Sequence, residues 1–214
     1  TLNAGNFANG AGTLNYTITG TPNSNGTASF AIQIGGQNCS LDVTVAAAPL
    51  AIGDTHEGGI IFYLDGSGGG LVSSTSNQSS EVWGCPSNTI GGTFSTLGTG
   101  SQNTSTIVSQ FLTILPSCGF PSAASVCYAL SLNGYSDWFL PSIDELSLMY
   151  DNIGPGNVLG LGNVGNFTLA GYWSSSEANA NDAHYLNFNP SISGGSASLS
   201  YKGNTPRVRA IRAF

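Results

Sequence analysis

The residues that could perform catalysis stand in incomplete arrangements. His56 and Glu57 begin like the H-E-x-x-H zinc helix, but Ile60 occupies the place of the second histidine. The serine run at 174–176 offers hydroxyl nucleophiles, yet the chain has no G-x-S-x-G elbow and only two histidines that could act as a base. We therefore predict no catalytic residue and a protein that is not an enzyme.

The carboxylates suggest structural roles and, as an alternative, a calcium site. Asp144 and Glu145 follow Ser142 with the S-x-x-E spacing of a capping box, so a helix N-terminus accounts for them. Calcium prefers hard oxygen ligands, but the sequence contains no D-x-[DN]-x-[DN]-G loop. We predict no cofactor and keep calcium as the alternative, with the candidate ligands Asp54, Glu57, Asp65 and Asp182.

Composition excludes several classes of partner. The 214 residues are 40% hydrophobic and only 7% charged, against about 25% charged residues in an average soluble protein. The formal net charge is −7, and Lys and Arg are absent before position 202. Because clustered bases are needed to bind phosphates and anionic membranes, nucleic acid and membrane insertion are excluded as partners. The scarcity of Lys and the abundance of Asn, Ser, Thr and Gly predict a secreted, extracellular protein.

The cysteines are predicted to form disulfides rather than a metal site. They contain no C-x-x-C motif and fit no zinc spacing. In an extracellular setting at least one disulfide is expected, and three complete pairings stay open. The four residues are Cys39, Cys85, Cys118 and Cys127.

The chain consists of two segments, which must position the carboxylates, serines and cysteines named above. Before position 46, apolar and polar residues alternate with the period of two that is typical of half-buried strands. The expected strands are 14–19, 28–34 and 41–45, with a hairpin turn at Gly35-Gly36. An Ala-Ala-Ala-Pro run at 46–49 marks the boundary. We predict a partial β-sandwich over 1–47, a linker over 48–54 and a domain over 55–214.

The second segment mixes helical and strand patterns, which predicts an α+β domain. Apolar residues at 107, 108, 111, 112 and 115 give the stripe of an amphipathic helix. The expected helices are 103–115, 122–130 and 142–150, and the expected strands are 59–64, 71–74, 183–188, 197–201 and 208–214.

Several strings of the second segment resemble one known family. They are GGIIFYLDGSGGG (58–70), LGTGSQNTSTIV (97–108), NGYSDWFLPSIDELSLMY (133–150), GYWSSSE (171–177) and RVRAIRAF (207–214). In this order they resemble the C-terminal domain family of the Legionella collagen-like adhesin. The resemblance implies a C-type-lectin-like fold, with a small twisted antiparallel sheet, two or three short helices and long loops on one face that bind a ligand.

The first segment resembles a different family. The string GAGTLNYTITGTPNSNGTASFAIQIGGQNCSLDVTV (10–45) is similar to the second half of an immunoglobulin-like repeat from Bacteroidota surface adhesins. In those repeats the cysteine of the GGQxC string is matched by one upstream, which implies that Cys39 lacks its partner here. The two resemblances together imply the C-terminal end of a longer filamentous adhesin.

The candidate binding surface is the stretch between GYWSSSE and RVRA. In lectin-like variable proteins the equivalent stretch displays exposed, changeable side chains. Amides and carboxylates suit sugar hydroxyls, and an exposed Tyr can stack on a sugar face. The alternative is an ordinary solvated strand and loop. The candidate ligand-binding residues are Asn179, Asn181, Asp182, His184, Tyr185, Asn187, Asn189, Tyr201, Lys202 and Asn204.

Other prominent residues are assigned to the structure. Trp138 and Trp173 are predicted to be buried. The three arginines could bind sulfated glycans, but in a chain with so few bases we expect them to pair with acids such as Asp137, Asp144 or Glu145. The predicted structural residues are Trp138, Glu145, Trp173, Arg207, Arg209, Arg212, Cys85, Cys118 and Cys127.

Together these observations predict a non-catalytic cell-surface adhesin module that recognises a glycan or a protein through the loop face of a lectin-like domain. The alternative is an assembly or anchoring domain of a secreted filamentous protein. In that case the partner is another copy, or an outer-membrane carrier of the type IX secretion route, because an unpaired sheet edge accepts a strand from another chain.

Overall fold

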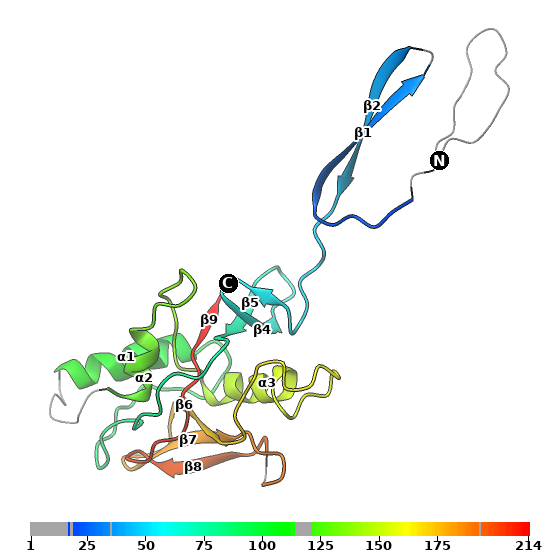
Figure 1. Ribbon diagram of the computed structural model, residues 1–214. Helices are drawn as coiled ribbons and strands as arrows, with labels where there is room; N and C mark the ends of the chain where they lie inside the picture. The colour runs from blue at the N-terminus through cyan, green and yellow to red at the C-terminus, as the bar shows by residue number, and fades with distance from the viewer. Residues whose placement is uncertain (1–16, 18, 35, 114–120, 193) are drawn as a thin grey trace. The chain divides into compact units, whose positions relative to one another are not determined.

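The computed structural model describes residues 17, 19–34, 36–113, 121–192 and 194–214. The chain divides into two compact units, Thr1–Leu50 and Ala51–Phe214, and each is described by itself. In these ranges the elements form an α+β fold with three antiparallel sheets and three helices (Figure 1), which confirms the predicted fold class. None of the helices in these ranges is both long and apolar enough to cross a bilayer.

The described residues of the first unit form a hairpin of two antiparallel strands, β1 (Gly26–Ile34) and β2 (Gln37–Val45). Gly36, in the turn, has a φ of +80°, a conformation that glycine adopts without steric cost. Paired residues share a face, so Phe30 and Leu41 lie on an apolar face while Ser29 and Asp42 lie on the polar one. The strand expected at 14–19 falls mostly outside the described residues.

The first sheet of the second unit has the order β3-β4-β5-β9. Its strands are β3 (Thr55–His56), β4 (Gly59–Leu64), β5 (Gly70–Ser73) and β9 (Ile211–Ala213). Strand β9 pairs with β5, so the C-terminal end of the chain completes a sheet that begins near position 55. The predicted strand 208–214 is shorter in the structure, because Val208 makes only an isolated bridge to Gln78.

The second sheet has the order β6-β7-β8, with β6 (Gly171–Glu177), β7 (Asp182–Asn187) and β8 (Ala197–Tyr201). Strand β6 was not expected from the sequence. All five residues from Tyr172 to Ser176 are buried, so this strand has no solvent-exposed face and lacks the alternation by which strands are recognised.

Three helices connect the sheets: α1 (Gly100–Thr113), α2 (Ala123–Tyr128) and α3 (Ile143–Ile153). Helix α3 contacts β4 of the first sheet and β6 and β7 of the second, while α1 packs on α2 and β6. The predicted capping box is present at the start of α3, and Ser122 and Ser125 form another at α2.

The main core fills the space around α3. Its aromatic centre is Phe188, whose ring lies 4.7 Å from Phe167 and 5.2 Å from Tyr150 between ring centroids. The cluster contains Ile60, Phe62, Leu71, Phe139, Ile143, Leu146, Met149, Tyr150, Ile153, Phe167, Tyr172, Leu186, Phe188 and Ile211. It therefore joins both sheets into one rigid support for the surface residues.

Candidate functional site

The turn between β6 and β7 uses its asparagines to hold its own backbone. Asn179 Oδ1 accepts hydrogen bonds from the backbone N–H of Asn181 (2.8 Å) and of Asp182 (3.0 Å). Asn181 Oδ1 accepts one from the backbone N–H of Ser87 at 3.0 Å, which ties this turn to the loop before α1. These carbonyl oxygens are engaged within the protein.

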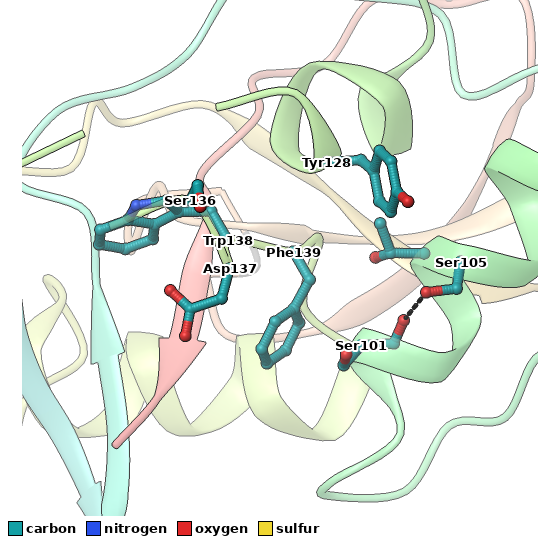
Figure 2. Close-up of a pocket in the computed structure, with 8 residues that line it drawn as sticks. Ser101, Ser105, Tyr128, Ser136, Asp137, Trp138 and Phe139 are labelled. Atoms are coloured by element: carbon teal, nitrogen blue, oxygen red, sulfur yellow. Dashed lines mark hydrogen bonds between the residues drawn. The ribbon is translucent and has the colours of Figure 1, made fainter. Parts of the chain in front are cut away.

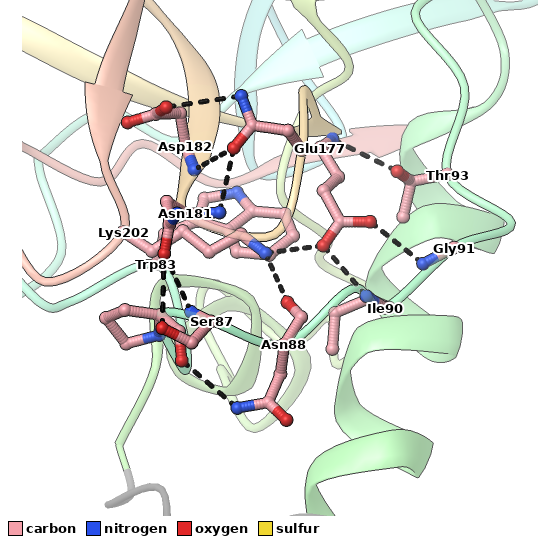
Figure 3. Close-up of polar contacts among 12 residues, drawn as sticks. Trp83, Ser87, Asn88, Ile90, Gly91, Thr93, Glu177, Asn181, Asp182 and Lys202 are labelled. Carbon is pink, nitrogen blue, oxygen red and sulfur yellow. Dashed lines mark hydrogen bonds and ion pairs between the residues drawn. The ribbon is translucent and has the colours of Figure 1, made fainter.

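Lys202 lies inside the protein rather than on the predicted binding surface. It is fully buried, and Figure 3 shows its ammonium between the Glu177 carboxylate and the backbone carbonyl of Asn88. The ammonium also lies 4.9 Å from the centroid of the Trp83 ring. Glu177 accepts two further hydrogen bonds, from the backbone N–H groups of Ile90 and Gly91, each at 2.8 Å. The Lys202 ammonium is thus unavailable to an external ligand.

Asn187 and Asn189 stabilise the turn that follows β7. Asn187 donates to the carbonyl of Ile192 and accepts from the backbone N–H of Asn189 at 3.0 Å. Asn189 in turn accepts from the backbone N–H of Ser191 at 3.0 Å. Both amides are therefore parts of the loop architecture, as expected for Asn in turns.

Strands β7 and β8 leave a smaller set of predicted residues open to solvent, together with Leu199, which was not predicted to bind a ligand. His184 pairs with Leu199, and Asp182 pairs with Tyr201, so the four side chains share one face of the sheet. Leu199 and Tyr201 are 53% and 50% exposed, and Asp182 and His184 are half-buried. We call these four residues the β7–β8 patch.

The remaining candidates lie outside the β7–β8 patch. Tyr185 pairs with Ser198 on the opposite face, and its ring lies 6.4 Å from that of Trp173. Asn204 is exposed and donates to the hydroxyl of Ser200 at 3.0 Å.

The tryptophans and Glu145 lie in the interior. Trp138 and Trp173 are 2% and 0% exposed, and their indole N–H groups donate to the carbonyls of Tyr135 and Glu81. Glu145 is also fully buried and accepts from the backbone N–H groups of Ser142 (2.7 Å) and Gly98 (2.9 Å). Burial raises the pKa of the Glu145 carboxyl above its ordinary value.

The expectation that the arginines pair with acids holds for Arg212 only. Arg212 binds Asp137 through two hydrogen bonds of 2.7 and 2.9 Å and also contacts Glu57. Arg209 is fully buried and donates instead to Asn77 and to the carbonyls of Ser74, Gly165 and Asn166. Arg207 is exposed and makes no ion pair within the described part of the chain.

The acids named as partners therefore have different roles. Asp137 pairs with Arg212, whereas Asp144 is exposed in the first turn of α3 and Glu145 serves the capping box. A guanidinium held by an amide and carbonyls needs no carboxylate, which is why spacing and charge counting did not predict the Arg209 site.

The cysteines differ from one another. Cys85 is disulfide-bonded, in agreement with the prediction of at least one disulfide, while Cys118 lies outside the described residues. Cys127 was predicted to be a structural residue with its pairing left open, and it is a free, fully buried thiol on α2 whose pKa is raised by burial. Cys39 is a free, exposed thiol on β2.

The candidate calcium ligands do not converge. Asp54 accepts a hydrogen bond from the backbone N–H of Ala51, and Glu57 forms an ion pair with Arg212. Asp182 accepts a hydrogen bond from the side-chain amide of Asn179. Asp65 accepts from Ser67 and Gly69, and these hydrogen bonds lower the pKa of its carboxyl. Within the described ranges, no three His, Cys, Asp or Glu side chains gather into a possible metal site.

A polar cleft of about 330 Å³ lies away from the β7–β8 patch and was not predicted (Figure 2). It is formed by α1, the end of α2 and the segment before α3. The serine pair at positions 101 and 105 has the spacing of neighbours on one helix face, which is the local signal of these two residues in the sequence. The lining residues are Ser101, Thr104, Ser105, Tyr128, Ser136, Asp137, Trp138 and Phe139.

Comparison with known proteins finds similarity to a solved structure. No family model matches the chain, and no curated protein matches it. The fold is similar to that of a fimbrial protein from Bacteroides ovatus ATCC 8483, with 14% sequence identity and a TM-score of 0.49. The similarity covers 88% of this chain and 57% of that protein. The chain thus spans little more than half the length of the protein it matches, and the two family resemblances noted in the sequence stay predictions.

Proposed function

We propose that this chain is a non-catalytic recognition module of a cell-surface adhesin, and that it contacts a glycan or a surface protein through the β7–β8 patch. The observation that carries the proposal is the pair of half-exposed side chains on β8, Leu199 and Tyr201, beside Asp182 and His184. An aromatic ring next to a carboxylate and an imidazole offers stacking together with hydrogen bonding.

The other polar groups support a binding role over a catalytic one. The buried ionisable residues Glu145, Glu177 and Lys202 are all engaged in hydrogen bonds or ion pairs within the fold. A general acid or base needs access to a substrate, which these residues lack. The motif strings that resemble the adhesin domain family support the same proposal, and they support a location on a bacterial cell surface.

The proposal is tested with the whole chain on an array of glycans and extracellular-matrix proteins, with and without EDTA. We expect binding to at least one target, weakened about tenfold or more by Tyr201→Ala or Leu199→Ala, because truncating an interface anchor costs roughly 1–2 kcal/mol or more. Leu169→Ala is the matched control, since Leu169 is 54% exposed on a loop outside the β7–β8 patch. No binding to any target, or equal binding by all three variants, contradicts the proposal. Loss of binding in EDTA that added Ca²⁺ restores assigns the binding to calcium.

Assembly is the second candidate function, and a feature of the first unit favours it. The apolar face of the β1–β2 hairpin leaves Phe30, Leu41 and Val43 between 36% and 41% exposed. A groove of about 440 Å³ lies along this face between the hairpin and residues 19–22. A two-stranded sheet with an open apolar face is suited to receive another β-sheet, from a second copy or a carrier protein.

Substitutions on the two faces of β2 test assembly. Leu41→Lys places a charge on the apolar face, whereas Thr44→Lys places one on the polar face, where Thr44 pairs with Thr27. We expect a concentration-dependent oligomer that Leu41→Lys dissociates and Thr44→Lys preserves, measured by light scattering after size exclusion. A chain that stays monomeric at all concentrations contradicts this function.

A further inference from the structure

The cleft of Figure 2 has the size and accessibility of a small-ligand site. Its volume of about 330 Å³ falls at the lower end of the roughly 300–1,000 Å³ that ligand pockets occupy. Trp138 and Phe139 are buried and form its apolar wall, while Tyr128 is 56% exposed at the end of α2. The cleft therefore combines a fixed wall with an aromatic ring that a ligand can reach.

Hydroxyl groups line the side of the cleft formed by α1. Ser101 and Ser105 are four residues apart and lie on the same helix face, both exposed. The Ser105 hydroxyl donates its proton to the backbone carbonyl of Ser101 at 3.1 Å, so its oxygen keeps lone pairs that can accept a hydrogen bond. These groups suit a ligand rich in hydroxyl donors.

Asp137 supplies a carboxylate in a fixed orientation. Arg212 holds its two oxygens at 2.7 and 2.9 Å, and the same guanidinium lies 3.9 Å from the centroid of the Tyr135 ring. Each carboxylate oxygen retains a second acceptor position. Arg212 also lowers the pKa of the Asp137 carboxyl, which keeps it ionised under neutral and mildly acidic conditions. Because Arg212 compensates the charge of Asp137 and the chain carries a net −7, the cleft does not favour an anionic ligand.

We propose that this cleft is a second binding site, separate from the β7–β8 patch, and that it takes a neutral saccharide. The Tyr128 ring stacks on the apolar face of a pyranose ring. Asp137 and the α1 serines accept hydrogen bonds from its hydroxyl groups. Figure 2 shows the proposed binding residues around Phe139. Asp137 lies on one side of this ring, and Tyr128, Ser101 and Ser105 lie on the other.

The test uses the whole chain and a panel of neutral sugars: glucose, galactose, mannose, fucose and N-acetylglucosamine. Saturation-transfer NMR identifies the sugar that binds, and titration gives its affinity. We expect Tyr128→Ala to weaken this affinity about tenfold or more, and Tyr128→Phe to retain most of it, because stacking needs the ring and not the hydroxyl. Ser105→Phe, at an exposed helix position, fills the cleft and is expected to abolish binding.

Leu169→Ala is the matched control, because Leu169 is 54% exposed and lies outside both sites, and Tyr201→Ala tests the β7–β8 patch separately. Binding lost in Tyr128→Ala and kept in Tyr201→Ala supports the cleft, whatever happens to the function proposed for the β7–β8 patch. Binding lost only in Tyr201→Ala contradicts a saccharide site in the cleft and supports the function proposed for the β7–β8 patch. Equal affinity in wild type, Tyr128→Ala and Ser105→Phe contradicts a saccharide site in the cleft. The absence of saturation transfer to every sugar in the panel contradicts it as well.

Discussion

At the scale of residues, three of the four bases lie in the interior. Lys202 and Arg209 are 0% exposed and Arg212 is 6% exposed. A buried charge is strongly destabilising unless ion pairs and hydrogen bonds compensate it. Each base has such partners: Glu177 for Lys202, Asn77 and carbonyls for Arg209, and Asp137 for Arg212. The bases of this chain therefore mainly stabilise its fold, and little positive charge remains at the surface for a ligand.

Removal of the Lys202 ammonium is expected to destabilise the protein. Lys202→Met leaves the Glu177 carboxylate buried without its cation, and such losses cost about 3–5 kcal/mol. The free energy of unfolding in urea measures the effect. Arg207→Ala is the control and should change it by less than about 0.5 kcal/mol, since Arg207 is exposed.

A double variant separates the ion pair from general packing. Lys202→Met combined with Glu177→Gln removes both charges, so its loss of stability should be clearly smaller than the sum of the two single losses. A Lys202→Met protein as stable as the wild type would show that the ammonium does not stabilise the fold.

At the scale of elements, the start of α3 links a local motif to a distant loop. Within the capping box, Ser142 accepts from the backbone N–H of Glu145, and Glu145 accepts from that of Ser142. Glu145 also accepts from the backbone N–H of Gly98, just before α1. A Cβ at Gly100 would lie 2.3 Å from the Glu145 carboxylate, so glycine is required for this close approach. One side chain thus fixes the ends of two helices.

Loss of the cap should destabilise the second unit. Ser142→Ala leaves the backbone N–H of Glu145 without its acceptor, and N-cap substitutions of this kind cost about 1 kcal/mol. Thermal unfolding followed by circular dichroism measures the change. Ser147→Ala, in the same helix, is the control: its hydroxyl only donates to the carbonyl of Ile143, so we expect a change below about 0.5 kcal/mol. Equal effects of both substitutions would contradict the role of the cap.

At the scale of the whole molecule, the two units differ in how much they bury. Every buried hydrophobic side chain of the described residues lies at or beyond Ile60, in the second unit. The first unit has one described sheet of two strands, a size that is marginal without further packing. The β7–β8 patch and the saccharide cleft both lie on the second unit, where the core holds their elements in place.

Separate expression of the units tests this difference. We expect residues 51–214 to unfold cooperatively with the midpoint of the full chain, and residues 1–50 to show no cooperative transition. Differential scanning calorimetry of the three proteins measures both. A midpoint for 51–214 that falls by many degrees would show that the first unit contributes to the stability of the second.

The sequence by itself determined what depends on neighbours a few residues apart. Alternation predicted β1 and β2, a strand pattern predicted β7 and β8, the S-x-x-E spacing predicted the start of α3, and the mixture of patterns predicted the α+β class. Composition predicted that the chain does not bind partners that need a basic surface. These features are encoded locally, because one turn of helix or one strand contains the whole signal.

Only the tertiary structure decided which polar groups are free to bind. Lys202 meets Glu177, 25 positions earlier in the chain, and Asn181 meets Ser87, 94 positions earlier, so neither engagement has a local signal. The cleft is likewise assembled from α1, the end of α2 and residues 136–139. Residue type and local spacing indicate which chemistry a side chain can perform. Whether a ligand can reach that side chain depends on long-range packing, which brings distant segments into contact and buries some polar groups while exposing others.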